Sequence, residues 1–216
     1  MNDKADTAEV FPRAGLRLLG TSDLHMHLRS FDYFRDEPDP SVGLTRVASL
    51  IRAARQEAGA NACLLFDNGD GLQGTPMEET TPGAVHPLTQ CFTALRYDAI
   101  GLGNHDFDFG LKALTSVIAS VPCPVLCSNL HWDDPRQNLP VLQQVILPAQ
   151  VECSDERTRP IQVGVFSVLP PQTLKWNGHE LKGRAQIDDM VDTAQRMIAE
   201  LRADGADLVI AMAHTG

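Results

Sequence analysis

Four short polar clusters in the sequence contain side chains of the types that bind divalent cations. They comprise Asp23 with His25, Asp70, Asn104 with His105, and His214. Carboxylate, imidazole and amide oxygen ligands together suit Mn²⁺, Zn²⁺ or Fe²⁺, and the absence of thiolates beside them argues against a structural zinc knot. The sequence therefore predicts a metal site built from oxygen and nitrogen ligands.

The spacing of these residues favours two ions rather than one. Asp23 and His25 are two positions apart, so in an extended backbone their side chains lie on the same side and can chelate one ion. Asp70 has two carboxylate oxygens and can bridge to a second ion, whose ligand set Asn104 can complete without adding charge. Two ions about 3.5 to 4 Å apart stabilise both the attacking and the leaving oxygen of a phosphoryl displacement. Phosphate-ester hydrolysis is the predicted chemistry.

His105 directly follows the predicted ligand Asn104. We predict that it faces the phosphate as a cation or general acid, and that Asp108 orients it and raises its pKa. Taken singly, Asp23 and Asp70 are also compatible with helix caps or turns, where Asp is common. His27 lies two residues beyond His25 and is left out of the predicted ligand set.

The elements that must position these clusters alternate along the chain. Apolar runs at 16–19, 62–66, 99–102, 124–127 and 207–213 predict strands, the first of them buried, and helices are predicted at 47–59, 86–95, 111–121 and 187–201. Residues rich in β-branched side chains between 141 and 168 predict antiparallel strands. The alternation indicates an α/β domain, and ligands bind at the carboxyl ends of strands in such sheets.

Composition narrows the classes of partner. The chain has 216 residues and a formal charge of −10, with a pI near 5.0, which argues against a nucleic-acid polymer or an acidic membrane as partner. No apolar run is long enough to span a bilayer. The first ten residues contain no apolar segment typical of a signal peptide, so the cytoplasm is the default location. The five scattered cysteines are typical of free thiols rather than a disulfide framework, and those beside apolar residues are predicted to be buried.

Five ordered blocks resemble the metallophosphatase domain of the 5′-nucleotidase family. They are T-S-D-L-H at 21–25, D-N-G-D-G-L-Q-G at 67–74, Y-D-A-I-G-L-G-N-H-D-F-D at 97–108, S-N-L at 128–130 and A-H-T-G at 213–216. The chain is most similar to the 2′,3′-cyclic-nucleotide 2′-phosphodiesterase/3′-nucleotidase branch. That branch also has a D-P-S-V-G-L loop, as at 39–44, and a V-L-P-P-Q segment followed by Trp, as at 168–172 and Trp176.

The resemblance implies a fold and a role for each matching residue. The implied fold is α/β, a calcineurin-like layered β-sandwich flanked by helices. Asp23 and His25 would bind the first metal, Asp70 would bridge, Asn104 and His214 would bind the second, and His105 would be the catalytic histidine, paired with Asp108. The implied ions are Mn²⁺, Zn²⁺, Fe²⁺ or Co²⁺. Their hydroxide would attack the phosphorus of a 2′,3′-cyclic nucleotide or 3′-nucleotide, with 5′-nucleotides or nucleotide-sugars as the alternative on the same fold.

The sequence departs from the family pattern in two places. Asp106 stands where Glu is usual, a change that keeps the charge and is expected to matter little. The family also has a G-H-x-H block after A-H-T-G and then a nucleoside-binding domain. Neither is present, so five of seven expected ligands remain. We therefore predict a flexible tail at 1–14 and a truncated catalytic domain at 15–216, with an inactive metal-binding fragment as the alternative. The branch is typically periplasmic, in contrast to the cytoplasmic default.

Overall fold

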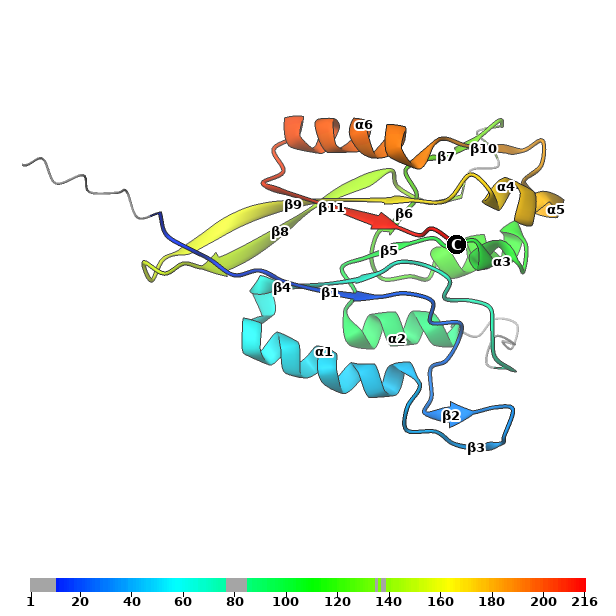
Figure 1. Ribbon diagram of the computed structural model, residues 1–216, viewed down its shortest axis with the longest axis horizontal. Helices are drawn as coiled ribbons and strands as arrows, with labels where there is room; N and C mark the ends of the chain where they lie inside the picture. The colour runs from blue at the N-terminus through cyan, green and yellow to red at the C-terminus, as the bar shows by residue number, and fades with distance from the viewer. Residues whose placement is uncertain (1–10, 77–84, 135, 137–138) are drawn as a thin grey trace, which may run out of the picture.

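Two β-sheets face each other in the computed structural model, which describes residues 11–76, 85–134, 136 and 139–216, and helices cover their outer faces (Figure 1). The first sheet is entirely parallel. Its strand order is β1 (Arg17–Thr21), β4 (Cys63–Asp67), β5 (Ala99–Gly101) and β6 (Val125–Leu126). The second sheet has the order β11 (Leu208–Ala213), β9 (Thr158–Val168) and β8 (Gln144–Glu152), with β8 antiparallel and β11 parallel to β9.

Helices are distributed between the two outer faces. The first sheet packs against α1 (Leu44–Ala58), α2 (Pro87–Leu95) and α3 (Leu111–Ile118), and the second against α6 (Met190–Ala203). Shorter elements connect them: the 3₁₀ turns η1 (Ala60–Ala62) and η3 (His105–Phe107), helices α4 (Thr173–Trp176) and α5 (Gly178–Leu181), and the strand pairs β2 (Phe31–Asp32) with β3 (Glu37–Pro38) and β7 (Leu130–Trp132) with β10 (Ala185–Ile187).

Strand β4 shows how the layers are held together. Successive side chains of a strand point to opposite faces of the sheet. Leu65 therefore packs among the helices, whereas Leu64 and Phe66 pack toward the second sheet, where Val163 and Val165 of β9 meet them. Because both faces of β4 are covered, all five of its residues are buried. The core thus continues through four layers: helix, sheet, sheet and helix.

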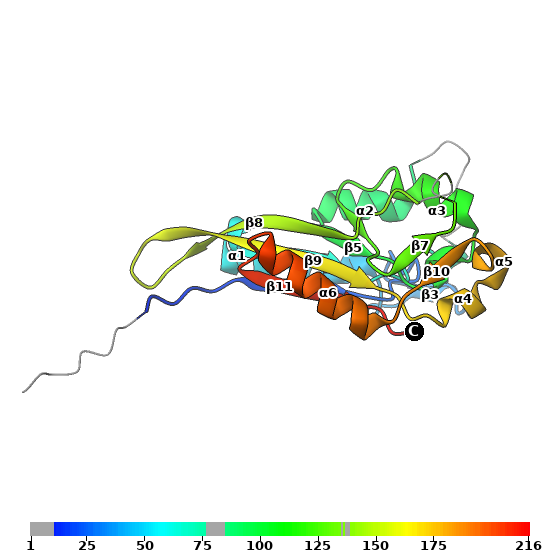
Figure 2. The same cartoon turned by 90° about the horizontal axis from the view of Figure 1, so that it is seen from above.

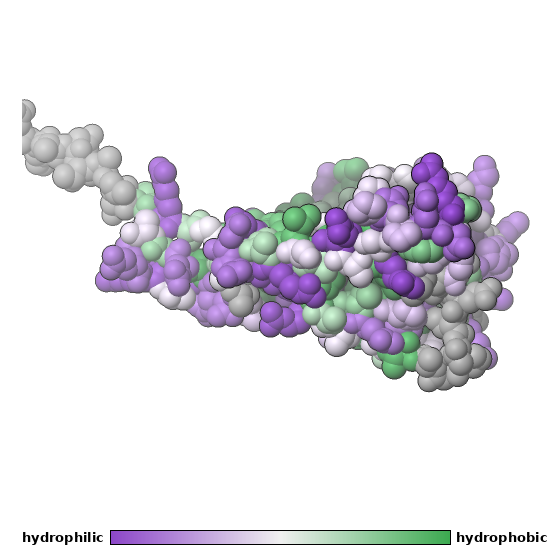
Figure 3. All heavy atoms as spheres, turned by 90° about the horizontal axis from the view of Figure 1, so that it is seen from below, coloured by the Kyte–Doolittle hydropathy of each residue, from purple (hydrophilic) through white to green (hydrophobic). Residues whose placement is uncertain are grey.

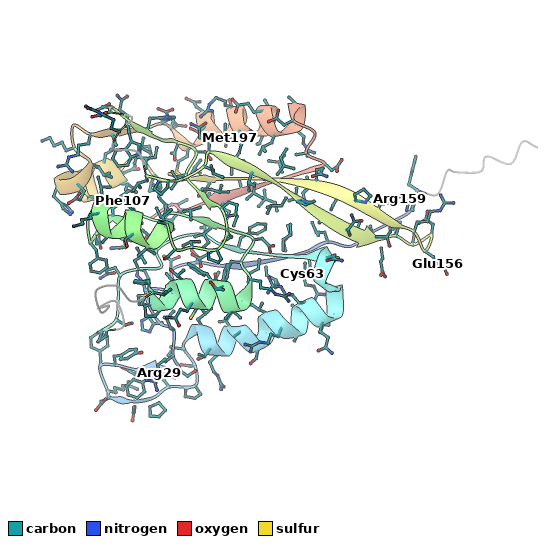
Figure 4. The ribbon with its side chains drawn as sticks, turned by 180° about the vertical axis from the view of Figure 1, so that it is seen from behind. Arg29, Cys63, Phe107, Glu156, Arg159 and Met197 are labelled. Carbon is teal, nitrogen blue, oxygen red and sulfur yellow. The ribbon has the colours of Figure 1, made fainter. Side chains whose placement is uncertain are left out.

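Helix α6 closes the outer face of the second sheet. It begins at Asp189, whose side chain accepts hydrogen bonds from the backbone N–H groups of Val191 and Asp192 and so caps the helix. Met197 and Leu201 are fully buried against this sheet, and Figure 4 labels Met197 on the inner side of the helix.

Most predicted elements are confirmed, with differences in detail. The strand predicted at 16–19 is present as β1, but the prediction that it is buried is wrong. Leu18 is 45% exposed because β1 forms an edge of the described sheet. In α1 the buried positions are Leu44, Ala48 and Ile51, whereas Leu50, predicted on the apolar face, is 71% exposed. The pairing of β7 with β10 was not predicted, because three-residue strands carry no usable periodicity.

The β8–β9 hairpin extends beyond the rest of the sheets (Figures 1 and 2). Glu156 and Arg159, labelled in Figure 4, lie at its tip, and Arg159 pairs there with Asp155. Residues 13 and 14 lie beside the loop of this hairpin. Arg13 forms two hydrogen bonds with Ser154, and Ala14 forms a β-bridge with Cys153. The remainder of the tail predicted at 1–14 includes residues 1–10, which lie outside the described residues.

The cysteines are free thiols. Cys63 and Cys127 are buried as predicted, whereas Cys91 and Cys123 are only partly buried. Burial raises the pKa of Cys127 to about 12, so this thiol is protonated and unreactive at neutral pH. The molecular face in Figure 3 is largely hydrophilic with small, separated apolar areas, in keeping with the charged composition. No helix among the described residues combines the length and apolar character needed to cross a bilayer.

Candidate active site

The strands that were expected to deliver the polar clusters end close together. In Figure 1, β1, β4, β5 and β11 all run toward the region where the chain end is marked C. Three of these strands belong to the first sheet and β11 to the second, so the site lies where the two sheets meet. The carboxyl ends of parallel strands are the usual place for a ligand site in α/β folds.

All five predicted metal ligands are brought together. Asp23, His25 and Asp70 offer ligand atoms that lie within 4.8 Å of one another. On the other side of Asp70, Nε2 of His214 lies 3.1 Å from its Oδ2 and 3.2 Å from Oδ1 of Asn104. Asp70 therefore stands between two groups of potential ligands, one from the first sheet alone and one completed by the second sheet.

The two histidines are oriented as metal ligands usually are. Nδ1 of His25 lies 2.7 Å from the carbonyl oxygen of Gln73, and Nδ1 of His214 lies 3.0 Å from that of Asn68. Because a carbonyl can only accept, Nδ1 carries a proton in both rings, and Nε2 is the ring nitrogen that faces the carboxylates. A metal-bound histidine typically donates its other ring N–H in this way. The donor set thus fits divalent cations.

The electrostatics of the pair Asp70 and His214 are consistent with a cation site. Both side chains are buried. Burial opposes ionisation of Asp70, but the hydrogen bond and charge of His214 lower its pKa below the usual value. For His214, burial works against the charged form, yet its contact with Asp70 raises its pKa. A buried carboxylate whose ionised form depends on a neighbouring positive charge is well placed to bind a metal ion.

Backbone strain is concentrated at the ligand positions. Asp23, His25 and Asp70 have φ angles of 53°, 44° and 57°, a left-handed conformation that costs a non-glycine residue about 1–3 kcal/mol. Hydrogen bonds between the two loops hold it in place, since Asp23 N–H donates to Gly69 O and His25 N–H donates to Asp70 O, each at 3.0 Å. Such strain is typical of functional loops.

His105 and Asp108 form the predicted pair. Nδ1 of His105 lies 2.8 Å from Oδ2 of Asp108, and this hydrogen bond raises the pKa of His105, opposed by partial burial. The His105 ring lies 5.5 Å from the ring of His25, measured between centroids, so the pair borders the metal ligands. Asn177, which the sequence analysis missed, donates from Nδ2 to Oδ1 of Asp108 at 2.9 Å. The only cue to Asn177 in the sequence is its place after Trp176.

Known proteins resemble the chain in sequence and in fold, although no family model matches it. It is 35% identical over 208 residues to a 2′,3′-cyclic-nucleotide 2′-phosphodiesterase/3′-nucleotidase of Yersinia enterocolitica, covering 93% of this chain and 31% of the relative. A crystal structure of the calcineurin-like phosphoesterase YfkN from Bacillus subtilis matches with a TM-score of 0.86 and 32% identity, covering 94% of this chain and 63% of that one. The chain belongs to the 5′-nucleotidase family of calcineurin-like phosphoesterases.

Membership of the 5′-nucleotidase family confirms the predicted resemblance and the calcineurin-like fold. The human 5′-nucleotidase is more distant, with 28% identity over 221 residues, covering 97% of this chain and 36% of the human protein. The chain therefore spans about a third of the length of these two curated relatives.

Asn68 connects the two sheets within this 5′-nucleotidase-family site. Its side-chain Nδ2 donates to the carbonyl of Ala213 at 3.1 Å, and its own carbonyl accepts from Nδ1 of His214. Asn68 thus ties the end of β4 to the end of β11 and orients His214 toward Asp70. The sequence analysis did not single it out, because its partners, Ala213 and His214, lie about 145 residues further along the chain.

A cavity of about 470 Å³ adjoins the predicted catalytic pair. It is lined by Asn104, His105, Asp108, Trp176, Asn177 and Gly216. Trp176 is 49% exposed and lines the cavity, whereas Phe34 is 96% exposed on the β2–β3 turn and does not line it. His27 is not part of the described group of ligand atoms.

Asn177→Ala is expected to lower turnover of a phosphodiester about 10-fold, with metal content unchanged. The substitution removes the donor that holds Asp108, and loss of such supporting partners in metal sites typically costs 10- to 100-fold. The measurement is kcat and KM with 2′,3′-cyclic AMP, a phosphodiester whose leaving oxygen needs a proton. Asn129→Ala serves as the control, since Asn129 is also a buried amide, and its side chain bonds, among the described residues, to backbone groups of Leu169 and Asp188. Unchanged kcat in Asn177→Ala would contradict the role of Asn177 in holding Asp108.

Proposed function

We propose that the chain is the catalytic domain of a two-metal phosphoesterase that hydrolyses nucleotide phosphate esters, with 2′,3′-cyclic nucleotides and 3′-nucleotides as substrates. The position of Asp70 is the observation that carries this proposal. One carboxylate, 3% exposed, lies within reach of Asp23 and His25 on one side and of His214 on the other. A carboxylate shared by two ligand groups is what a pair of closely spaced ions requires.

The metal ligands divide into two groups around Asp70. Asp23, His25 and Asp70 would hold one ion, and Asp70, Asn104 and His214 the other. Bound there, two divalent ions would supply positive charge for the phosphate and activation of water. Asn104 adds no charge, so two divalent ions would carry more positive charge than the carboxylates Asp23 and Asp70 can balance, and the excess favours an anionic substrate.

His105 is the proposed general acid. Asp108 accepts from Nδ1 and stabilises the charged ring, so this hydrogen bond raises the pKa of His105 and favours the protonated form that a general acid needs. Nε2 is then the atom that donates, either to a phosphoryl oxygen or to the oxygen of the leaving group. His105 also lines the cavity beside the metal ligands, which is where a leaving nucleoside has room.

The substrate class is proposed from the relatives' names. The Yersinia enterocolitica and Haemophilus influenzae relatives, each 35% identical, are named as 2′,3′-cyclic-nucleotide 2′-phosphodiesterase/3′-nucleotidases. A Bacillus subtilis relative at 33% identity is named as a trifunctional nucleotide phosphoesterase. The human 5′-nucleotidase, at 28%, favours hydrolysis of 5′-nucleotides as the second candidate.

Metal content and hydrolysis by this same chain test the proposal. After loading with Mn²⁺ or Zn²⁺, elemental analysis should find close to two ions per chain, and bis(p-nitrophenyl) phosphate should be hydrolysed. A panel of 2′,3′-cyclic AMP, 3′-AMP and 5′-AMP then assigns the substrate class. Preference for 5′-AMP would replace the proposed substrate but keep the phosphoesterase. One weakly bound ion or none, without turnover, would mean that this chain is a binding fragment rather than an enzyme.

A further inference from the structure

Asp106 is a buried carboxylate that the proposed chemistry does not use. It lies in η3, next to Phe107, which Figure 4 labels, and it is 5% exposed. Among the described residues, no Lys, Arg or His forms an ion pair with it. An unpaired buried carboxylate is costly, so its retention needs a physical reason.

Backbone N–H groups from two different loops surround this carboxylate. Oδ2 accepts from Gly103 at 2.8 Å and from Asp70 at 3.0 Å. Oδ1 accepts from Gly71 at 2.9 Å and from Leu72 at 3.2 Å. Each oxygen therefore receives two hydrogen bonds, and convergent backbone N–H groups of this kind stabilise an anion without a cation.

The two loops joined in this way carry the metal ligands that face each other. Asp70 belongs to the loop after β4, and Gly103 immediately precedes Asn104 in the loop after β5. The backbones are in close contact, since a Cβ added to Gly69 would overlap the backbone nitrogen of Gly103. The N–H of His105 also donates to Oδ1 of Asp70 at 2.7 Å. A small movement between the loops would change the distance from Asp70 to Asn104.

We infer that Asp106 is a positioning residue, whose carboxylate holds the loops after β4 and β5 together and thereby sets the distance between the metal ligands Asp70 and Asn104. The inference rests on the proposed metal site but not on turnover. The role of Asp106 differs from that of the metal ligands. Both of its carboxylate oxygens accept hydrogen bonds from backbone N–H groups, so they face the backbone of the two loops and not the proposed ions.

Three substitutions test this role through Co²⁺ binding, measured by calorimetry and by the visible absorption spectrum of the bound ion. Asp106→Asn replaces one acceptor oxygen by a donor facing two N–H groups, and we expect Co²⁺ to bind at least about 10-fold more weakly, with an altered spectrum. Asp106→Glu keeps the carboxylate, and a small cavity of about 30 Å³ beside Asp106 leaves room for the added methylene, so binding should stay within about threefold.

Asp98→Asn is the matched control. Asp98 is another partly buried carboxylate that accepts a backbone N–H, from Leu65 at 2.7 Å, but it precedes β5 at the end away from the metal ligands. The Asp98→Asn variant should bind Co²⁺ with the same affinity as the wild type. The inference would be overturned if Asp106→Asn bound Co²⁺ with the affinity and spectrum of the wild type. It would also be overturned if Asp106→Glu or Asp98→Asn lost as much Co²⁺ affinity as Asp106→Asn.

The wild-type chain supplies a measurement that does not depend on whether a variant folds. Without metal, the amides of Gly71, Leu72 and Gly103 should exchange with deuterium at least about 100-fold more slowly than in an unstructured chain, because Asp106 accepts from them. Exchange at unprotected rates would overturn the inference. If the chain bound Co²⁺ as expected but hydrolysed no phosphate ester, the proposed function would fail and the positioning role would stand.

Discussion

Asp70→Asn should abolish metal loading and hydrolysis together. The substitution keeps the shape of the side chain but removes the negative charge that is shared between the two groups of ligands. It also places an amide where two cations need a carboxylate. We expect metal affinity and kcat each to fall at least about 100-fold, measured by elemental analysis after Mn²⁺ loading and by hydrolysis of bis(p-nitrophenyl) phosphate.

The control for Asp70→Asn is a carboxylate that touches histidine away from the metal ligands. Asp188 lies 2.9 Å from Nε2 of His131, between β7 and the end of β10, and Asp188→Asn should leave metal content and turnover unchanged. If Asp70→Asn retained two ions and full activity, Asp70 would not be the shared ligand. The two-ion proposal would then lose its main support.

His105→Ala is expected to have the opposite pattern, with metal retained and turnover lost. The His105 ring is bonded to Asp108 and lines the cavity, and among the described residues it is not part of the group of ligand atoms around Asp23 and Asp70. Removing a general acid typically costs a factor of about 10² to 10⁴ in kcat. Elemental analysis and steady-state kinetics on the same sample separate this outcome from a loss of metal.

Leaving-group dependence strengthens the test of His105. A substrate whose leaving group is acidic, such as p-nitrophenolate, needs little protonation, so His105→Ala should impair a 3′-nucleotide more than bis(p-nitrophenyl) phosphate. Equal impairment of both substrates would mean that His105 acts on the phosphoryl oxygens rather than on the leaving group. Loss of metal in His105→Ala would make it a ligand and contradict its assignment as the acid.

The two supporting residues, Asn177 and Asp106, act at different points of the site. Asn177 holds Asp108 and thus the orientation of His105, so its removal should affect kcat while metal is retained. Asp106 holds the backbones beside Asp70 and Asn104, so its removal should first affect metal binding. Comparing the two variants therefore distinguishes positioning of the acid from positioning of the ions.

The sequence by itself determined the longer strands, most of the longer helices and the types of ligand. The buried run of β4 and the alternating β-branched residues of β9 are local patterns, and the polar residues that follow each strand are adjacent to it in the chain. Chelation by Asp23 and His25 could also be proposed locally, because the two are close in sequence. Their left-handed backbone could not, since hydrogen bonds from the loop at 69–70 impose it.

Tertiary structure alone decided which groups meet and which partners support them. His214 reaches Asp70 because β11 lies in the second sheet and Asn68 ties its end to β4. Leu18 is exposed because β1 is an edge strand of the described sheet, and the apolar residues of β1 do not indicate its position in the sheet. Asn177 and Asp106 act through contacts 69 and up to 36 residues away. The physical reason is common to all of these: periodicity and spacing report local geometry, whereas burial and hydrogen-bond partners depend on which elements pack together.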